Sequence, residues 1–263
     1  MIDPVPHVPE WLVRIPIAHR GLHDASHGVI ENSLPAFWAA ARSGFPAELD
    51  VRLLADGEVV VFHDQDLGRL TNESGPIAAR TARDLERVFL SGATTHDDPN
   101  PDDARVPLLR DVLDMIAGAT PLLVEVKNEG DVGPLEAAVV SLLASYHGLH
   151  AMQSFHPGTV RYWREHAPQT PRGLLSGDFR DEKIDEAARA RLRDMASIDE
   201  CEPDFIGYDI RLVPREVVTR QRAAGRPVLG WTARSVVDAK RALVHCDNVI
   251  FEGFDASVLR AQK

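Results

Sequence analysis

Short apolar runs rich in β-branched residues alternate with longer amphipathic stretches along the whole chain. The short runs predict strands at Ile15–Ala18, Ala47–Arg52, Leu122–Val126, Ala151–Ser154, Arg172–Leu175, Phe205–Tyr208, Val228–Trp231 and Val249–Phe251. The longer stretches predict helices at Leu34–Ser43, Leu108–Ala117, Pro134–Tyr146, Thr159–His166, Asp181–Met195, Pro214–Ala224 and Ser235–Leu243. Strands that alternate with helices are typical of a parallel sheet, and eight such runs predict an α/β chain folded as a single (β/α)8 TIM barrel.

One segment interrupts this alternation. After Arg52, the run Ala55-Asp56-Gly57-Glu58 is a turn signal, and Val59–Phe62 follows as a second strand, so residues 50–63 read as a hairpin. From about residue 65 to 106 the pattern is mixed and ends in the acidic, proline-containing loop Thr94–Asp103. We expect a small insertion after the second strand that caps the barrel mouth, within one domain spanning residues 1–263.

Composition narrows the class of partner. The apolar fraction of 44% suffices for a sizeable core, and the net charge is −11 without a cluster of basic residues, so nucleic acid is not an expected partner. Cys201 and Cys246 are expected to be reduced thiols, because their spacing fits neither a zinc site nor a disulfide scaffold. The sequence start lacks a signal-peptide pattern and no stretch is long and apolar enough to span a bilayer, which predicts a cytoplasmic protein without stable membrane association.

Charged and imidazole side chains gather where the predicted strands end. Active sites of (β/α)8 barrels lie at the carboxyl ends of the strands, so these side chains are candidates for chemistry. They are His19 and Arg20 on the first strand, Glu48 and Asp50 on the second, His63 and Asp64 after the hairpin, Glu125 and Lys127 on the third, and Trp231 on the seventh.

The carboxylates predict a metal site. Glu48 and Asp50 are two residues apart on one strand, so both side chains point to the same face, into the barrel, and Glu125 adds a third carboxylate from the next strand. Buried carboxylates without a counter-charge are costly, and a divalent cation removes this cost. Ligation by oxygen alone favours one Mg²⁺ or Ca²⁺. Structural ion pairs, Glu48 with Arg52 and Glu125 with Lys127, are the alternative reading.

Two histidines suit acid and base catalysis. Among eleven histidines, His19 and His63 are the two at strand ends beside charged neighbours. Cleavage of a phosphodiester needs one group that deprotonates the attacking oxygen and one that protonates the leaving oxygen, and imidazole titrates in the required range. Arg20 can bridge phosphate oxygens, and Lys127 can stabilise negative charge that develops in the transition state.

The ordered motifs resemble those of glycerophosphodiester phosphodiesterases. They are His19-Arg20-Gly21, Glu31-Asn32-Ser33 with Ala36-Phe37, Glu48-Leu49-Asp50-Val51, Val61-Phe62-His63-Asp64 with Leu67, Arg69 and Thr71, Glu125-Val126-Lys127, Gln153-Ser154-Phe155, and Trp231-Thr232. Any one motif is weakly specific, whereas the ordered set, which runs from the first predicted strand to the seventh, is highly specific.

The resemblance implies a TIM barrel with an insertion and assigns roles to individual residues. It implies that His19 and His63 are the acid/base pair and that Glu48, Asp50 and Glu125 hold Mg²⁺ or Ca²⁺. It further implies phosphate contacts from Arg20 and Lys127, a substrate pocket lined by Trp231, and a supporting Glu31 near the catalytic cluster.

Two positions depart from the family pattern. Near the last strand, where the family tends toward a Thr-Asp pair followed by proline, this chain has Phe251-Glu252-Gly253-Phe254. Two residues after Thr232, where asparagine is usual, this chain has Arg234. Both departures fall at the predicted barrel mouth, so they leave the catalytic motifs intact and the alcohol specificity open.

The expected activity is therefore metal-dependent hydrolysis of a small glycerophosphodiester to glycerol phosphate and an alcohol. A phospholipase D-like or phosphoinositide-cleaving activity is the alternative, although the acidic loop Thr94–Asp103 argues against docking on an anionic bilayer. A catalytically silent barrel that binds phosphodiesters or a protein partner is a third alternative, which the presence of both histidines together with all three carboxylates disfavours. The sequence leaves open the alcohol group, the native metal, direct attack by water or a cyclic phosphate route, which histidine is the acid, and whether the chain forms a homo-oligomer.

Overall fold

The computed structural model describes residues 8–92, 104–180 and 184–260. The chain divides into two compact units, one formed by Ala18–His150 and the other by Met1–Ile17 together with Ala151–Lys263. We call them the 18–150 unit and the 151–263 unit. The predicted acidic loop Thr94–Asp103 lies outside the described residues, as does the predicted helix start at residues 181–183.

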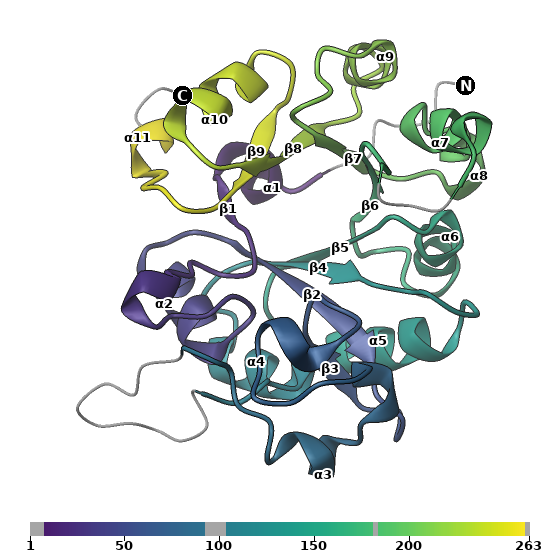
Figure 1. Ribbon diagram of the computed structural model, residues 1–263. Helices are drawn as coiled ribbons and strands as arrows, with labels where there is room; N and C mark the ends of the chain where they lie inside the picture. Colours follow the sequence, from purple (N-terminus) through teal and green to yellow (C-terminus); the bar gives the residue numbers. More distant parts are fainter. Residues whose placement is uncertain (1–7, 93–103, 181–183, 261–263) are drawn as a thin grey trace. The chain divides into compact units, whose positions relative to one another are not determined.

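The 18–150 unit is built on two long parallel strands. β2 (Ala47–Leu53) pairs with β4 (Leu122–Val126), and the short β1 (Ile17–Ala18) adds to β2 through Ala18 and Ala47. The predicted hairpin is confirmed, because β3 (Val59–Val61) runs antiparallel to β2. Figure 1 shows β2, β3 and β4 together with the helices of this unit, α2 (Leu34–Arg42), α4 (Leu109–Ile116) and α5 (Pro134–Ala144).

The insertion after the hairpin has a small apolar core of its own. It contains the single turns η2 (Leu67–Arg69) and η3 (Ile77–Ala79) and the short helix α3 (Ala82–Leu85), and η1 (Ala25–His27) precedes it in the chain. Leu67, Ile77 and Leu85 are buried in one cluster with Val60 and Phe62 of the hairpin. The insertion is therefore anchored to the hairpin by apolar contacts, which hold the residues between them in fixed positions.

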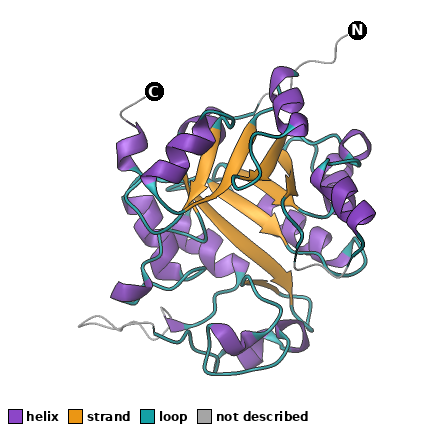
Figure 2. Ribbon diagram, turned by 45° about the horizontal axis from the view of Figure 1, so that its top comes forward, coloured by secondary structure: helices purple, strands orange, loops and turns teal. Residues whose placement is uncertain are grey.

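The 151–263 unit repeats strands and helices in regular alternation. Its parallel strands are β5 (His150–Ser154), β6 (Arg172–Ser176), β7 (Phe205–Asp209), β8 (Val228–Ala233) and β9 (Asn248–Phe251). Its helices are α1 (Glu10–Arg14), α6 (Pro157–His166), α7 (Glu186–Arg193), α8 (Ile198–Cys201), α9 (Glu216–Ala223), α10 (Val236–Leu243) and α11 (Ser257–Arg260). Figure 2 shows helices in purple beside the orange strands, and the residues between the two layers form an apolar core.

The eight parallel strands follow one another along the chain in the order of a (β/α)8 barrel, with β3 as the extra antiparallel strand. The predicted fold class and the insertion after the second strand are confirmed. All eight predicted strands and all seven predicted helices are present, the strand Leu122–Val126 with the predicted bounds and the others with shifted ends, while the short α1, α3, α8 and α11 were not predicted. They were missed because segments of four or five residues carry too little periodicity.

The two cysteines are both buried and free, as expected. Burial raises the pKa of the Cys201 thiol to about 11 and that of the Cys246 thiol to about 12, so both remain protonated near neutral pH. Among the described residues, no helix combines the length and apolar character that crossing a membrane requires.

Candidate active site

Three carboxylates meet inside the 18–150 unit. Glu48 and Asp50 lie on β2, and Glu125 lies opposite Asp50 on the parallel strand β4. Alternation along β2 turns both of its carboxylates to one face, and each of the three residues offers an oxygen within 4.8 Å of the others. Their exposed fractions are 1%, 1% and 7%. The sequence prediction that these side chains converge is confirmed.

The electrostatics of this cluster fit a divalent cation. Burial raises the pKa of Glu48 well above its usual range, and repulsion from Asp50 and Glu125 raises it further. One Glu48 oxygen accepts a hydrogen bond from the Arg20 backbone amide at 2.9 Å, whereas Oε1 has no hydrogen-bond partner among the described residues. A buried carboxylate oxygen without a partner is the group that a hard cation would satisfy.

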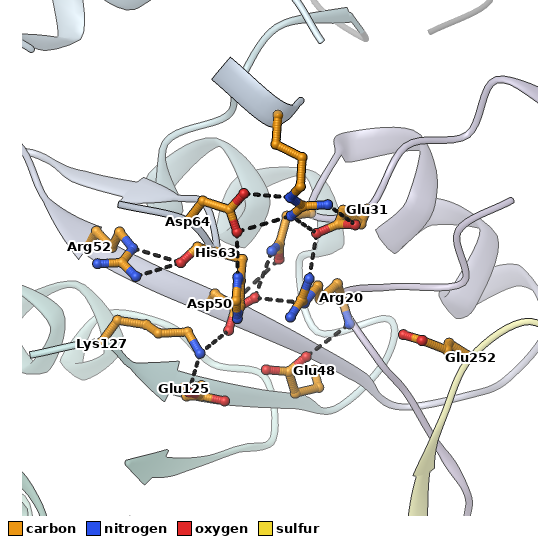
Figure 3. A network of polar contacts seen from close by, with 12 residues as sticks. Arg20, Glu31, Glu48, Asp50, Arg52, His63, Asp64, Glu125, Lys127 and Glu252 are labelled. Carbon is orange, nitrogen blue, oxygen red and sulfur yellow. Dashed lines mark hydrogen bonds and ion pairs between the residues drawn. The ribbon is translucent and has the colours of Figure 1, made fainter. Parts of the chain in front are cut away.

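Two cations on the protein neutralise part of the cluster. Lys127 Nζ lies 3.0 Å from Asp50 Oδ1 and also contacts Glu125. Arg20 Nε lies 3.2 Å from Asp50 Oδ2. Burial opposes ionisation of Asp50, but Lys127 and Arg20 outweigh it and lower its pKa. Lys127 and Arg20 therefore bring two positive charges into contact with Asp50 (Figure 3).

The ion-pair alternative from the sequence is half right. Glu125 does pair with Lys127, but Glu48 does not pair with Arg52. Arg52 instead contacts Glu129, with 2.7 Å between Nη1 and Oε1, and donates two hydrogen bonds to the His63 carbonyl oxygen. Arg52 thus holds the backbone of His63 in place and does not contact Glu48.

Both predicted histidines are near enough to Asp50 to influence its pKa. His19 directly follows β1, and His63 follows the hairpin. Positive charge on either ring contributes to the lowered pKa of Asp50, which places both imidazoles in its electrostatic neighbourhood. His63 Nδ1 lies 2.7 Å from Asp64 Oδ1, and burial lowers the His63 pKa despite the opposing charge of Asp50. The ring is therefore mainly neutral near pH 7 in the protein without ligand.

Glu31, predicted as a supporting residue, contacts Arg20. Its Oε1 lies 2.5 Å from Arg20 Nη1, and its side chain is 15% exposed. Burial opposes ionisation of Glu31, but hydrogen bonds from Arg69 and the charge of Arg20 lower its pKa. The carboxylate is thus ionised and holds the Arg20 guanidinium, which also contacts Asp50 (Figure 3).

Three further residues of the site had no role assigned from the sequence. Asn32 Nδ2 donates to Asp50 Oδ2 at 2.8 Å, and the Asp50 amide donates back to Asn32 Oδ1 at 3.3 Å. Asp64 binds His63, and Arg69 binds both Asp64 and Glu31. All three stand in the motifs that carry the family resemblance, which is the signal that could have identified them. The contacts of Asn32 with Asp50 and of Arg69 with Glu31 join residues 18 and 38 positions apart, so these two contacts were not predictable from a local pattern.

The backbone explains why glycine follows Arg20. Gly21 has a φ of 79°, and a Cβ built at this position would lie 2.7 Å from the carbonyl carbon of Ala36. The Gly21 amide donates to the Glu48 carbonyl oxygen at 3.1 Å. Gly21 therefore lets the turn after β1 lie close against both β2 and α2. This packing places His19 and Arg20 near the carboxylates.

Trp231 belongs to the 151–263 unit. It lies on β8, and its ring meets the Phe155 ring edge-on, with centroids 5.5 Å apart. A Cβ on Gly177 would come within 2.9 Å of the indole, so a small residue is needed there. The two departures from the family pattern contact one another, because Arg234 Nε lies 2.7 Å from Glu252 Oε1.

Comparisons with known proteins point to one family. Residues 19–252 match the glycerophosphoryl diester phosphodiesterase family. Glycerophosphodiester phosphodiesterases of Bacillus altitudinis and Caldanaerobacter subterraneus are 27% and 30% identical over 61% and 60% of this chain. The matches span 66% and 65% of those relatives, just under two thirds of either length.

Solved structures share the fold. An Oleispira antarctica phosphodiesterase in complex with the product sn-glycerol-3-phosphate aligns with a TM-score of 0.74 at 23% identity, covering 92% of this chain and 93% of that one. A Thermotoga maritima glycerophosphodiester phosphodiesterase aligns with a TM-score of 0.67 at 24% identity, covering 90% and 94%. The family match begins at His19 and includes every charged residue of the site. The chain therefore belongs to the glycerophosphoryl diester phosphodiesterase family.

Proposed function

We propose that the protein hydrolyses small glycerophosphodiesters to glycerol phosphate and an alcohol, using a divalent cation and two histidines. The observation that carries this proposal is the buried group Glu48, Asp50 and Glu125, with two protein cations and two imidazoles around it. Family membership supports the same activity. The product complex of the Oleispira relative supports a glycerol phosphate ligand.

The donor set suits Mg²⁺ or Ca²⁺, because it consists of carboxylate oxygens. Glu48, Asp50 and Glu125 would hold the ion, which supplies positive charge to the phosphate oxygens when bound. Arg20 has a planar guanidinium that can form paired hydrogen bonds with phosphate, and Lys127 adds a point charge. Together these groups would bind the anionic diester and stabilise negative charge that develops during its cleavage.

His19 and His63 divide the proton transfers in this proposal. One imidazole removes the proton from the attacking hydroxyl, of water or of the glycerol itself, and the other protonates the leaving alkoxide. We assign the acid to His63 because Asp64 holds its Nδ1, so that Nε2 is left to face the leaving oxygen. The neutral resting ring takes up its proton as the anionic diester binds nearby, since negative charge raises the pKa of an imidazole.

We assign to Trp231 a contact with the substrate, following the family motif Trp231-Thr232. Indole rings offer a flat apolar surface for a carbon chain such as glycerol. The alcohol group stays unassigned, because Arg234 and Glu252 replace the family residues near the ends of β8 and β9.

Purified protein assayed against glycerophosphocholine, glycerophosphoethanolamine and glycerophosphoglycerol, with Mg²⁺, Ca²⁺ and Mn²⁺ in parallel, tests the proposal. We expect glycerol phosphate release that depends on the cation. Absence of turnover under all conditions would contradict it. Faster turnover of phospholipid vesicles than of any soluble diester would favour the phospholipase D-like alternative.

A further inference from the structure

Arg69 joins two carboxylates that belong to different parts of the site. Its Nε lies 2.5 Å from Asp64 Oδ2, and its Nη2 lies 3.1 Å from Asp64 Oδ1. On the other edge, Nη1 lies 3.1 Å from Glu31 Oε2 and Nη2 lies 2.8 Å from Glu31 Oε1. One guanidinium therefore makes four hydrogen bonds to two carboxylates.

Each of these carboxylates holds a residue to which we assign chemistry. Asp64 Oδ1 lies 2.7 Å from His63 Nδ1, and Glu31 Oε1 lies 2.5 Å from Arg20 Nη1. The contacts form a continuous chain from His63 through Asp64, Arg69 and Glu31 to Arg20, and Figure 3 shows Asp64 and Glu31 in this network. The chain links the proposed acid to the proposed phosphate ligand.

The backbone of Arg69 is itself held in place. Arg69 ends η2, whose first residue, Leu67, is fully buried in the core of the insertion. The Asp66 side chain caps this turn by accepting from the Gly68 amide at 2.8 Å, and Thr71 Oγ1 donates to the Leu67 carbonyl oxygen at 2.9 Å. The guanidinium thus extends from a rigid segment rather than from a free loop.

Arginine suits this position for a geometric reason. Its planar fork offers donors on two edges, so it can pair with two carboxylates at once, whereas a lysine ammonium is a point charge on a flexible stem. The carboxylates are ionised, since hydrogen bonds from Arg69 and His63 outweigh burial and lower the Asp64 pKa to about 2. Because Asp64 can only accept, its contact fixes the His63 proton on Nδ1.

We propose that Arg69 is a positioning residue through which the insertion aligns His63 and Arg20 with each other. The inference rests on the proposed function, because it takes His63 as the acid and Arg20 as the phosphate ligand. The insertion then has a mechanistic role in addition to covering the hairpin. Arg69 acts through Asp64 on one residue and through Glu31 on the other, without touching the substrate.

The kinetic test uses Arg69→Met and Arg69→Lys beside a matched control. Arg110→Met removes the same group from another ion pair of the same unit, where Arg110 is 46% exposed against 47% for Arg69. We expect Arg69→Met to lose kcat/KM by about 10-fold to 100-fold, as for a misplaced catalytic group. Arg69→Lys should fall between Arg69→Met and wild type, and Arg110→Met should stay within about two-fold of wild type.

Single variants separate the two branches. Asp64→Asn should lower kcat on a diester with an alkoxide leaving group more than on a p-nitrophenyl ester, because it disturbs His63. Glu31→Gln should raise KM on both substrates alike, because it releases Arg20. Adding Arg69→Met to Asp64→Asn should worsen kcat by less than the product of the single effects, since both act through one contact.

A spectroscopic readout keeps this inference separate from the proposed function. In protein with ¹⁵N-labelled histidine, the His63 signals, assigned with His63→Gln, should report protonation at Nδ1 in wild type and a mixture of tautomers in Arg69→Met. This measurement needs no substrate, so it decides the positioning role even if the diesterase assay fails. Wild-type tautomer and wild-type kinetics in folded Arg69→Met would overturn the inference.

Discussion

The two units of the chain carry charge in different ways. In the 18–150 unit, three carboxylates share one buried site and are linked to both flanking cations and histidines. In the described part of the 151–263 unit, the buried Asp209 pairs with Arg211, with 2.6 Å between Nη2 and Oδ2. The contrast teaches that burial of charge alone does not mark a site. A functional site is instead indicated by a buried group of like charges that outnumber their counter-charges.

The largest effect we expect is from removal of the cation. Chelation with EDTA should abolish activity, and added Mg²⁺ or Ca²⁺ should restore it and raise the melting temperature, because an ion that binds only folded protein stabilises it by about 2.7 kcal/mol at 100 times its Kd. Glu48→Gln should abolish both effects, whereas Asp209→Asn should retain the stabilisation by metal. If both variants lost the stabilisation by metal, or if both kept it, the cation could not be assigned to the carboxylates of the 18–150 unit.

Loss of either histidine should rank next. We expect His19→Ala and His63→Ala each to lose about 10²-fold to 10⁴-fold in rate on glycerophosphocholine. A p-nitrophenyl ester, whose leaving group departs without a proton, should restore His63→Ala far more than His19→Ala. Rescue of His19→Ala alone would reverse the assignment of acid and base, and equal rescue of both would contradict any division of roles.

A substitution that disturbs the backbone packing at Gly21 should lower the free energy of unfolding, an effect smaller than the loss of either histidine. Gly21→Ala introduces a Cβ 2.7 Å from Ala36 at a φ of 79°, while Gly57→Ala meets nothing within 4 Å at a φ of 84°. Both variants share the cost of a left-handed conformation, so Gly21→Ala should be less stable than Gly57→Ala by about 1–3 kcal/mol. Urea unfolding of the two proteins measures this difference, and equal free energies of unfolding would refute the steric account.

The smallest effect should come from the exposed pair of the 151–263 unit. A double-mutant cycle with Arg234→Gln and Glu252→Gln should give a coupling free energy of at most about 1 kcal/mol, because Arg234 is 67% exposed. We expect kcat on glycerophosphocholine to stay within a few-fold, with changes limited to the KM values of diesters whose alcohols differ in charge. A large loss of kcat would place this pair in the chemistry itself.

The sequence by itself determined the barrel class, the hairpin and the convergence of Glu48, Asp50 and Glu125. These follow from local rules: alternation along a strand turns two carboxylates to one face, and parallel strands end at one edge of a sheet. The positions of His19 and His63 at strand ends came from the same rules and from the family motifs.

Only the tertiary structure decided which of the possible charge pairs form. Arg69 binds Glu31 across 38 residues, and Arg52 turns to Glu129 across 77 rather than to its near neighbour Glu48. A local sequence pattern does not encode such partners. They depend on how the loops pack, which decides the carboxylates that each arginine can reach. The contact of Arg69 with Glu31, which links the His63–Asp64 pair to Arg20, is therefore a property of the folded insertion and could not be read from the residues alone.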